Sequence, residues 1–197
     1  STDEVFGSLD ESESFSENSK YDPHSPYSAS KASSDHFVRA FYDTHKLPII
    51  ISNCSNNYGP NQHKEKLIPT VINSLINKSK IPVYGNGLNV RDWLYVEDHI
   101  EAIDMIFHNG SVGETYCIGG NNEIKNIDLI KLIIKEFDDT QQNKKSSIEL
   151  ITFVKDRLGH DYRYAIDISK IKNELGWEPK TNINNGLKNT LNWYLND

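Results

Sequence analysis

The chain has 197 residues, of which 37% are hydrophobic, and its formal net charge is −7. This length and composition can bury a hydrophobic core, which excludes a disordered polymer. The negative charge and the lack of a long Lys/Arg block exclude nucleic acid or an anionic membrane as the main partner. A small anionic ligand stays open, because its site needs only a few local donors.

The cysteines and histidines indicate the cellular compartment of the protein and whether it holds a metal. Cys54 and Cys117 lie far apart in separate apolar stretches, which suits buried thiols in a reducing compartment better than a disulfide framework. The histidines show no helical two-His spacing, so we expect no metal site. No apolar run approaches the roughly 18 residues that span a bilayer, and no leader opens the chain. We therefore expect a soluble, cytoplasmic protein without a membrane partner.

The first half of the sequence alternates helical and strand patterns. Apolar residues at steps of three and four predict a helix over 27–45, with Pro26 just before its start. The run Leu47–Ile51 predicts a short, fully buried strand of the parallel type. Turn residues predict a loop over 53–62, and a second helix follows over 67–76.

The second half continues the alternation. A third helix, over 98–107, has Ile100, Ile103, Ile106 and Phe107 as its predicted buried face. The other predicted elements are strands over 81–84, 90–96, 114–118 and 148–154, helices over 127–137, 168–175 and 183–195, and a polar loop over 138–147. Such alternation predicts an α/β fold with a mostly parallel sheet and a smaller mixed lobe.

Tyr27 and Lys31 are candidates for acid–base chemistry. They are four residues apart on the predicted helix, so they share a face, and a nearby ammonium group lowers the pKa of a phenol. A general base for an alcohol needs such a lowered pKa. Tyr42 and Lys46 have the same spacing, so a surface pair is the alternative; only Tyr27 is followed by small residues that let a flat cofactor approach.

Thr2, Asp3 and Glu4 place a hydroxyl and two carboxyl groups where a parallel strand is expected to end, and ligands of open α/β sheets bind there. If burial keeps one carboxyl protonated while the other is ionised, the pair can protonate a leaving hydroxyl and remove a proton from carbon. The alternative is a solvated acidic loop.

Cationic side chains recur later in the sequence. Lys66, Arg91 and Arg157 are donors that can hold a diphosphate, and arginine can do so with two parallel hydrogen bonds. Each of them taken singly is more often a surface charge.

Short motifs run through almost the whole chain in a fixed order. They are Ser-Thr-Asp-Glu-Val-Phe-Gly at 1–7, Ser-Pro-Tyr-Ser-Ala-Ser-Lys-Ala at 25–32, Asn-Cys-Ser-Asn-Asn-Tyr-Gly-Pro at 53–60, Glu-Lys-Leu-Ile-Pro at 65–69, Arg-Asp-Trp-Leu-Tyr-Val-Glu-Asp at 91–98, Gly-Glu-Thr-Tyr at 113–116, Asp-Arg-Leu-Gly-His-Asp at 156–161 and Leu-Gly-Trp-Glu-Pro at 175–179. Together they resemble the extended short-chain dehydrogenase/reductases, and within them the dTDP-glucose 4,6-dehydratases.

The resemblance implies an NAD-dependent lyase that converts dTDP-glucose to a 4-keto-6-deoxy sugar nucleotide, a precursor of deoxysugars such as rhamnose. Tyr27 would be the base for the C4 hydroxyl and Lys31 would lower its pKa and hold the nicotinamide ribose. Thr2 would bond the sugar, Asp3 would protonate the leaving C6 hydroxyl and Glu4 would take the C5 proton. Asn57 would lie near the nicotinamide, and the nucleotide-sugar pocket would be lined by Thr2, Asn56, Lys66, Leu67, Pro82, Tyr84, Arg91, Asn126, Arg157 and His160.

The resemblance also implies a domain organisation. The fold would be the C-terminal part of a Rossmann-like doubly wound parallel sheet plus a smaller mixed α/β substrate-binding lobe. Residues 1–80 would be the remainder of the NAD-binding domain with the catalytic residues, and 81–197 mainly the sugar-nucleotide lobe, with segments near 90–110 and 160–170 returning to the first part. A homodimer through the long helices, one of them the Tyr27 helix, would be the full-length state.

Three departures from the family pattern stand out. Phe6 replaces a usual Tyr, and Leu158 a usual Pro. The sequence also has no glycine-rich loop between a strand and a helix, which normally holds the cofactor pyrophosphate. We therefore expect a fragment that binds NAD poorly and turns over little by itself. The alternatives are a dehydratase for UDP- or GDP-sugars, an epimerase, or a non-catalytic sugar-nucleotide-binding module.

Overall fold

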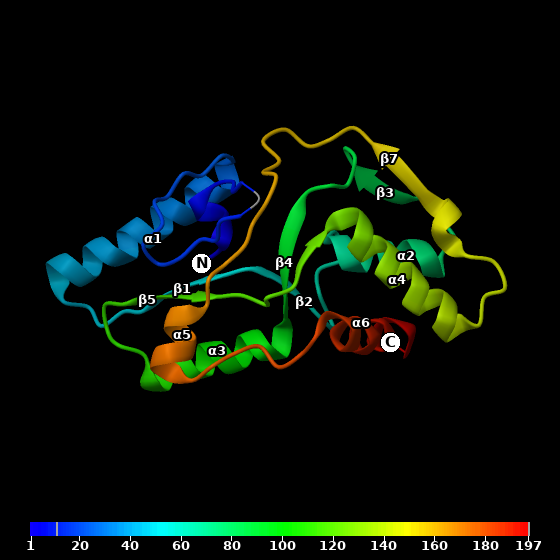
Figure 1. Cartoon of the computed structure of the whole chain (residues 1–197). Coiled ribbons are helices and arrows are strands. Elements are labelled where there is room, and N and C mark those ends of the chain that lie inside the picture. The colour runs from blue at the N-terminus through cyan, green and yellow to red at the C-terminus, as the bar shows by residue number, and fades with distance from the viewer. Residues whose placement is uncertain (11, 197) are drawn as a thin grey trace.

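The computed structural model describes residues 1–10 and 12–196, and Figure 1 shows the course of the chain. All six predicted helices are present, with ends that shift by a few residues. The elements in chain order are the 3-10 helix Asp3–Phe6, α1 (Pro26–His45), β1 (Ile51–Cys54), β2 (Asn56–Tyr58), α2 (Leu67–Ile76), β3 (Ile81–Tyr84), β4 (Val90–Tyr95), α3 (Val96–Asn109), β5 (Thr115–Ile118), β6 (Glu123–Lys125), α4 (Asn126–Gln141), a 3-10 helix (Ser147–Leu150), β7 (Ile151–Val154), α5 (Ser169–Leu175) and α6 (Ile183–Asn196).

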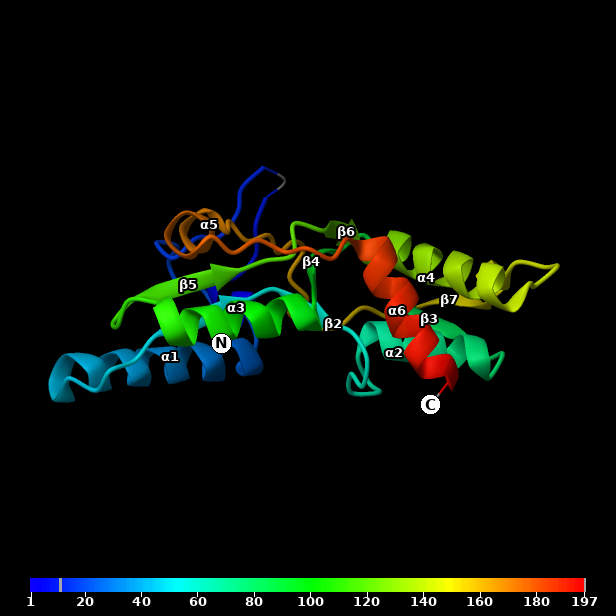
Figure 2. The ribbon, with the colours of Figure 1, turned by 90° about the horizontal axis from the view of Figure 1, so that it is seen from below.

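The strands form three small, mostly parallel sheets. β1 pairs with β5 and β3 pairs with β7, both in parallel. The third sheet has the order β2-β4-β6, in which β2 is parallel and β6 antiparallel to β4. Figure 2 shows α1 and α3 on one side of the β1–β5 sheet and α5 on the other. The predicted α/β class with a mainly parallel sheet is confirmed.

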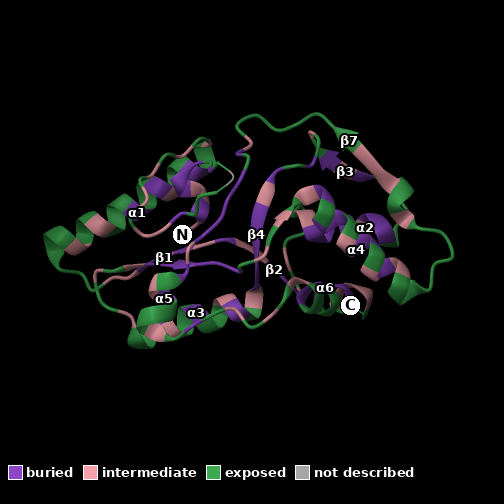
Figure 3. Ribbon diagram, viewed as in Figure 1, coloured by how far each residue is buried: buried purple, intermediate pink, exposed green. Residues whose placement is uncertain are grey.

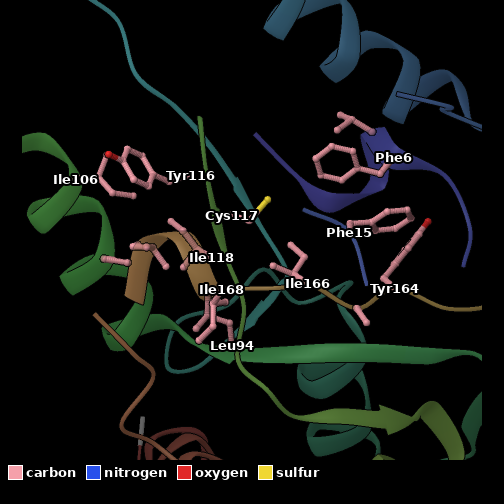
Figure 4. Packing of buried hydrophobic residues seen from close by; sticks show 14 of the residues in the cluster. Phe6, Phe15, Leu94, Ile106, Tyr116, Cys117, Ile118, Tyr164, Ile166 and Ile168 are labelled. Carbon is pink, nitrogen blue, oxygen red and sulfur yellow. The ribbon is translucent and has the colours of Figure 1, made fainter. Parts of the chain in front are cut away.

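Two hydrophobic cores hold these layers together. The first core gathers residues from the N-terminal 3-10 helix, α3, β5 and the segment 164–177. Figure 4 shows Phe6 and Phe15 side by side, near Tyr164 and Ile166. The second core gathers α2, β3, α4 and α6 around Tyr58 and Trp93. β4 contributes to both, since Leu94 lies in the first core and its neighbours in the second. The division at residue 80 stays a prediction, although α2 packs in the second core.

The first turn of α1 determines where this helix begins. The Ser25 Oγ accepts from the Ser28 N–H at 3.0 Å and the Ser28 Oγ accepts from the Ser25 N–H at 3.0 Å, with Pro26 at the first helical position. This capping box satisfies two of the N–H groups that a helix start leaves free. The helix ends at Lys46, whose φ of 57° is left-handed. The start of α1, one residue before Tyr27, is therefore fixed locally.

Two strand predictions were wrong in position. Leu47 and Pro48 are exposed, and the strand is β1, which starts at Ile51. The predicted loop over 53–62 contains the end of β1 and all of β2, which pairs with β4. Residues 148–150 belong to a 3-10 helix and not to β7, and α4 extends to Gln141, into the predicted loop. β6 was missed, because three residues give no readable alternation.

The predicted buried face of α3 was also wrong in part. Ile106 is buried, but Ile100 and Phe107 are 62% and 80% exposed, and Ile103 is exposed as well. The face that packs on the sheet runs instead through Asp98, Ala102 and Ile106. Asp98 is buried there because its carboxylate accepts hydrogen bonds from the backbone N–H groups of residues 180 and 181. None of the described helices has the length and apolar character needed to cross a bilayer.

Candidate active site

Thr2, Asp3 and Glu4 lie at the start of the N-terminal 3-10 helix. Thr2 forms a parallel bridge with Cys54, which places it beside the end of β1. Its Oγ1 accepts from the Glu4 N–H at 3.3 Å and donates to the Asp3 Oδ1 at 3.2 Å. Asp3 is buried, and its Oδ2 has no hydrogen-bond partner within the described chain. The strand-end position expected for this segment is thus the one it occupies.

The two adjacent carboxyl groups have raised pKa values. Burial raises the pKa of Asp3 to about 8, and the nearby charges of Glu4 and Asp92 act in the same direction. Burial also raises the pKa of Glu4, against the opposing charges of Arg91 and Lys66. Asp3 therefore holds a proton at neutral pH, while Glu4 faces the cations that favour its ionised form.

Tyr27 is in the first turn of α1 and half exposed. Its pKa is raised, first by burial and then by the charges of Glu4, Cys54 and Asp3, which places its phenol near these groups. This direction is opposite to the one predicted from the Tyr27–Lys31 spacing. The reasons are, first, that the phenol is partly buried and, second, that negative groups lie near it. In addition, no hydrogen bond in the described chain joins it to Lys31, which is half-buried one turn further along.

Three predicted site asparagines have a buried amide oxygen without a hydrogen-bond partner in the described chain. They are Asn56 and Asn57 on β2 and Asn126 at the start of α4. The Asn57 Nδ2 donates to the Ser55 carbonyl at 3.0 Å and to the Cys54 Sγ at 3.3 Å, which leaves its oxygen aimed elsewhere. An unsatisfied buried acceptor is costly, so these oxygens are candidates for ligand contacts.

The predicted cations come from different parts of the chain but act on the same carboxyl group. Lys66, Arg91 and Arg157 all lower the pKa of Glu4 by their charge, and Arg91 and Arg157 also lower that of His160. Burial is the largest cause of the lowered His160 pKa. The fold therefore collects around Glu4 the donors that the sequence predicted for a diphosphate.

Arg91 is more constrained than the sequence suggested. It is buried, its guanidinium lies 4.2 Å from the centre of the Tyr164 ring, and its Nη2 donates to the Asp161 carbonyl at 2.8 Å. Its Nη1 donates to the carbonyls of residues 90 and 162. Part of its donor capacity thus fixes the 161–164 segment.

Arg157, His160 and Tyr84 form a more open group. The Arg157 guanidinium lies 4.8 Å from the centre of the Tyr84 ring, and the His160 Nδ1 is 2.7 Å from the Asp156 Oδ1. Tyr84 is on β3 with Pro82, whereas Leu67 opens α2 next to Lys66. Pro82 and Leu67 are both half-buried.

Several residues at this site were missed by sequence reasoning. Asp92 is buried beside Asp3 and accepts from the N–H groups of Gly120 and Asn122, each at 2.7 Å. Asp161 accepts from the Tyr164 hydroxyl at 2.6 Å. Both lie inside quoted motifs, but only tertiary contacts reveal their burial.

Residues 1–190 match the family described as GDP-mannose 4,6 dehydratase. The chain belongs to this family. Among the curated members similar to it, a probable dTDP-glucose 4,6-dehydratase from Sinorhizobium fredii is 53% identical over 195 residues, which cover 99% of this chain. The chain spans about 56% of the length of that relative.

Solved structures of the family superpose closely on the chain. The dTDP-glucose 4,6-dehydratase of Bacillus anthracis, in complex with NAD, matches with a TM-score of 0.93 at 48% identity and covers all of this chain, which spans 60% of that protein. The corresponding enzyme of Streptomyces venezuelae, with NAD bound, matches with a TM-score of 0.94 at 41% identity, with 100% of this chain and 58% of that protein covered.

Proposed function

We propose that the full-length protein carrying this chain is an NAD-dependent hydro-lyase that converts dTDP-glucose to dTDP-4-keto-6-deoxyglucose. The observation that carries the proposal is the buried Asp3 carboxyl directly beside Glu4, with one oxygen that has no hydrogen-bond partner in the described chain. Burial raises the pKa of this carboxyl to about 8. Asp3 keeps its proton and can act as a general acid, whereas Glu4 faces cations that favour its ionised form and can act as a general base. An epimerase of this fold has no elimination to catalyse and no use for the pair.

In this proposal the chain's own groups move three protons. Tyr27 removes the proton of the C4 hydroxyl as that carbon is oxidised. Glu4 takes the proton from C5, and Asp3 gives its proton to the C6 hydroxyl, which leaves as water. Once hydride has been returned to C6, Glu4 gives its proton back to C5. The proton that Tyr27 took from the C4 hydroxyl equals the one that Asp3 gave up to the leaving water. Atoms balance, because one water leaves and the hydride taken from C4 is returned.

Tyr27 can serve as the base only with help from a cation. Burial and the nearby carboxyl groups raise its pKa, so at neutral pH the phenol alone is protonated. Lys31 lies one helical turn away on the same face and is the cation nearest to Tyr27 along α1. Its ammonium, turned toward the phenol, stabilises the phenolate.

The residues present fit the nicotinamide end of NAD. Asn57 has an unpartnered buried oxygen at the edge of the same sheet as β4, and Tyr27 and Lys31 supply a hydroxyl and an ammonium for a ribose. NAD would supply the oxidant that accepts hydride from C4 and returns it to C6. Lys66, Arg91, Arg157 and His160 would bind the nucleotide diphosphate, with Tyr84 and Asn126 beside them.

We also propose that the full-length protein is a cytoplasmic homodimer. Both cysteines are free, which suits a reducing compartment. On α1, Phe37 is 69% and Phe41 is 51% exposed, one turn apart on a single face. An apolar face of this kind is typical of a helix that packs against another protein surface.

The deciding experiment uses the full-length protein with dTDP-glucose and catalytic NAD. We expect the 4-keto-6-deoxy product, detected by its absorbance in alkali. The variants Asp3→Asn and Glu4→Gln should still oxidise C4, which is seen as reduced nicotinamide, but should form no product. The exposed control Asp139→Asn should turn over normally. Product formation unaffected by both site substitutions would overturn the roles of Asp3 and Glu4. A protein that binds dTDP-glucose but never oxidises it would instead be the non-catalytic binding module.

A further inference from the structure

A buried carboxylate on α1 lies outside every motif role assigned above. α1 is exposed over most of its length, as Figure 3 shows, and its buried residues are Ser28, Ala32 and Asp35. Asp35 follows Lys31 by four residues and Tyr27 by eight, so the three lie along one side of the helix. A buried carboxylate needs donors to offset its lost hydration.

The donors of Asp35 come from two segments that hold the N-terminal 3-10 helix. Its Oδ2 accepts from the Tyr21 hydroxyl at 2.9 Å and from the Asn53 Nδ2 at 3.3 Å. Burial and the charge of Asp35 raise the pKa of Tyr21, so that its hydroxyl stays a donor. One oxygen therefore joins α1 to β1 and to the loop before α1.

Asn53 continues this connection to one end of the 3-10 helix. Its Nδ2 also donates to the Thr2 carbonyl at 3.1 Å. Asn53 is completely buried, and both neighbours of its Nδ2 are acceptors, so the opposite amide orientation would bring oxygen against oxygen. The side chain is thereby locked between Asp35 and the residue that precedes Asp3.

Tyr21 makes the connection to the other end. Its ring packs edge-on against Phe6, with 5.3 Å between ring centres, and Phe6 is the last residue of the 3-10 helix. The neighbouring Asp22 N–H donates to the Val5 carbonyl at 3.0 Å. Both ends of the four-residue helix that contains Asp3 and Glu4 are therefore held by groups that bond the same carboxylate.

We propose that Asp35 is a positioning residue: through Asn53 and Tyr21 it holds the Asp3–Glu4 pair in place against the helix that carries Tyr27. The effect of Asp35 on the reaction rate rests on the proposed function. Asp35 does not act on the substrate. It sets the distance between the group that deprotonates the C4 hydroxyl and the groups that remove water, and misplacement by about 1 Å can cost on the order of 100-fold in rate.

The kinetic test compares three variants of the full-length protein. Asp35→Leu removes the acceptor, and we expect kcat for the 4-keto product to fall roughly 10- to 100-fold with KM unchanged, while reduced nicotinamide accumulates. Asp35→Asn keeps an amide oxygen that can accept both bonds, and we expect it to recover most of kcat. Asp43→Leu, at an exposed position of α1, is the control with the same loss of charge. Wild-type kcat and no accumulation in Asp35→Leu would overturn the proposal.

A second readout does not depend on turnover. The Asp3 carboxyl can be titrated by NMR in protein labelled with ¹³C-aspartate. If Asp35 holds the 3-10 helix, Asp35→Leu lets water reach Asp3 and its pKa falls from about 8 toward its ordinary value, and Asp43→Leu leaves it unchanged. Should Asp35→Leu not fold, Asn53→Ser breaks the same connection. An unchanged Asp3 titration would overturn the positioning role, whereas a wild-type protein inactive on dTDP-glucose would overturn only the proposed function.

Discussion

The proposed chemistry depends on one unusual side chain, Asp3. Asp3 is a buried carboxyl, with one donor in Thr2 and negative neighbours in Glu4 and Asp92. Each of these except the Thr2 hydroxyl disfavours its ionisation, and Arg91 only partly compensates. The result is an acid that keeps its proton at neutral pH, a property that can be measured through folding as well as through catalysis.

The Asp3 proton makes stability depend on pH with a definite sign. The folded state holds this proton up to about pH 8, whereas the unfolded chain releases it near pH 3.8. Between these values the folded state binds more protons, so the free energy of unfolding falls as pH rises, by up to about 1.4 kcal/mol per pH unit. In Asp3→Asn this fall disappears, and the variant gains stability relative to wild type from pH 4 to pH 8.

Denaturant unfolding of the full-length protein at several pH values measures this effect. The exposed Asp43→Asn is the control, and its unfolding curve should follow that of wild type at each pH. Parallel stability profiles for wild type and Asp3→Asn would mean that Asp3 is ionised in the folded protein, which would remove it as the acid.

Lys31 offers a second test at the residue scale. Because burial and then nearby negative groups raise the pKa of Tyr27, we expect the proposed base to depend on the ammonium group one turn away. We expect Lys31→Met to slow C4 oxidation by about 10²- to 10⁴-fold at neutral pH and to recover as pH rises, whereas Tyr27→Phe stays inactive at every pH. Stopped-flow absorbance of reduced nicotinamide measures the step. Lys46→Met, in the equally spaced pair with Tyr42, is the control, and an equal loss there would refute the assignment.

Sequence reasoning reached the site residues that are adjacent or one helical turn apart. Thr2, Asp3 and Glu4 are contiguous, and Tyr27 precedes Lys31 by four, so local geometry keeps the members of each group on neighbouring positions. Asp35 and Asn53 were missed, because their importance lies in contacts between segments 18 residues apart in sequence. The sequence held one signal for Asp35, which follows Lys31 at the same four-residue spacing that separates Lys31 from Tyr27.

At the scale of elements, polar strands and exposed apolar helix faces misled the prediction. The strand β1 has the sequence Ile-Ser-Asn-Cys and is buried because Asn53 bonds inside the fold, whereas the apolar run just before it is partly exposed. On α3, the apolar periodicity predicted that Ile100 is buried, but Asp98 lies on the buried face and Ile100 is exposed. A hydrophobic pattern therefore mispredicts burial where a polar side chain, such as Asn53 or Asp98, finds hydrogen-bond partners inside the fold.

The turn between β5 and β6 allows a test of how closely these elements pack. A Cβ on Gly120 would overlap the Trp93 carbonyl oxygen and lie 2.6 Å from its carbon, so Gly120→Ala forces β4 away. We expect a loss of about 3 kcal/mol in the free energy of unfolding. Gly176 has φ of +72° but open space around it, and Gly176→Ala should cost only about 1 kcal/mol.

Thermal or denaturant unfolding of both glycine variants provides the comparison. Because Asp92 accepts from the Gly120 N–H, the Gly120→Ala variant should also lose dehydration activity, while Gly176→Ala should keep it. Equal stability losses in the two variants would show that the β4 backbone can move without strain.

The two cores of the described chain meet along β4, and Arg91 and Asp92 of this strand belong to neither core. The first core binds the segment that contains Asp3 to β5 and α5, and the second binds α2 and α4, which begin next to Lys66 and at Asn126. The site therefore lies where the two cores meet. The sequence predicted two parts, but it could not show that α2 would pack with the later elements, because that contact spans more than 50 residues.

The proposed homodimer can be tested at the exposed apolar face of α1. Phe37 and Phe41 are exposed one turn apart, and burying both side chains against a second copy would contribute about 3–6 kcal/mol. We expect the full-length protein to sediment as a dimer and the double variant Phe37→Glu/Phe41→Glu as a monomer, because two carboxylates on each copy would meet across the interface. Phe153→Glu, equally exposed but on β7, should leave the dimer intact. A wild-type monomer, or a double variant that remains dimeric, would place these phenylalanines against another part of the same full-length chain and remove the dimer from the proposal.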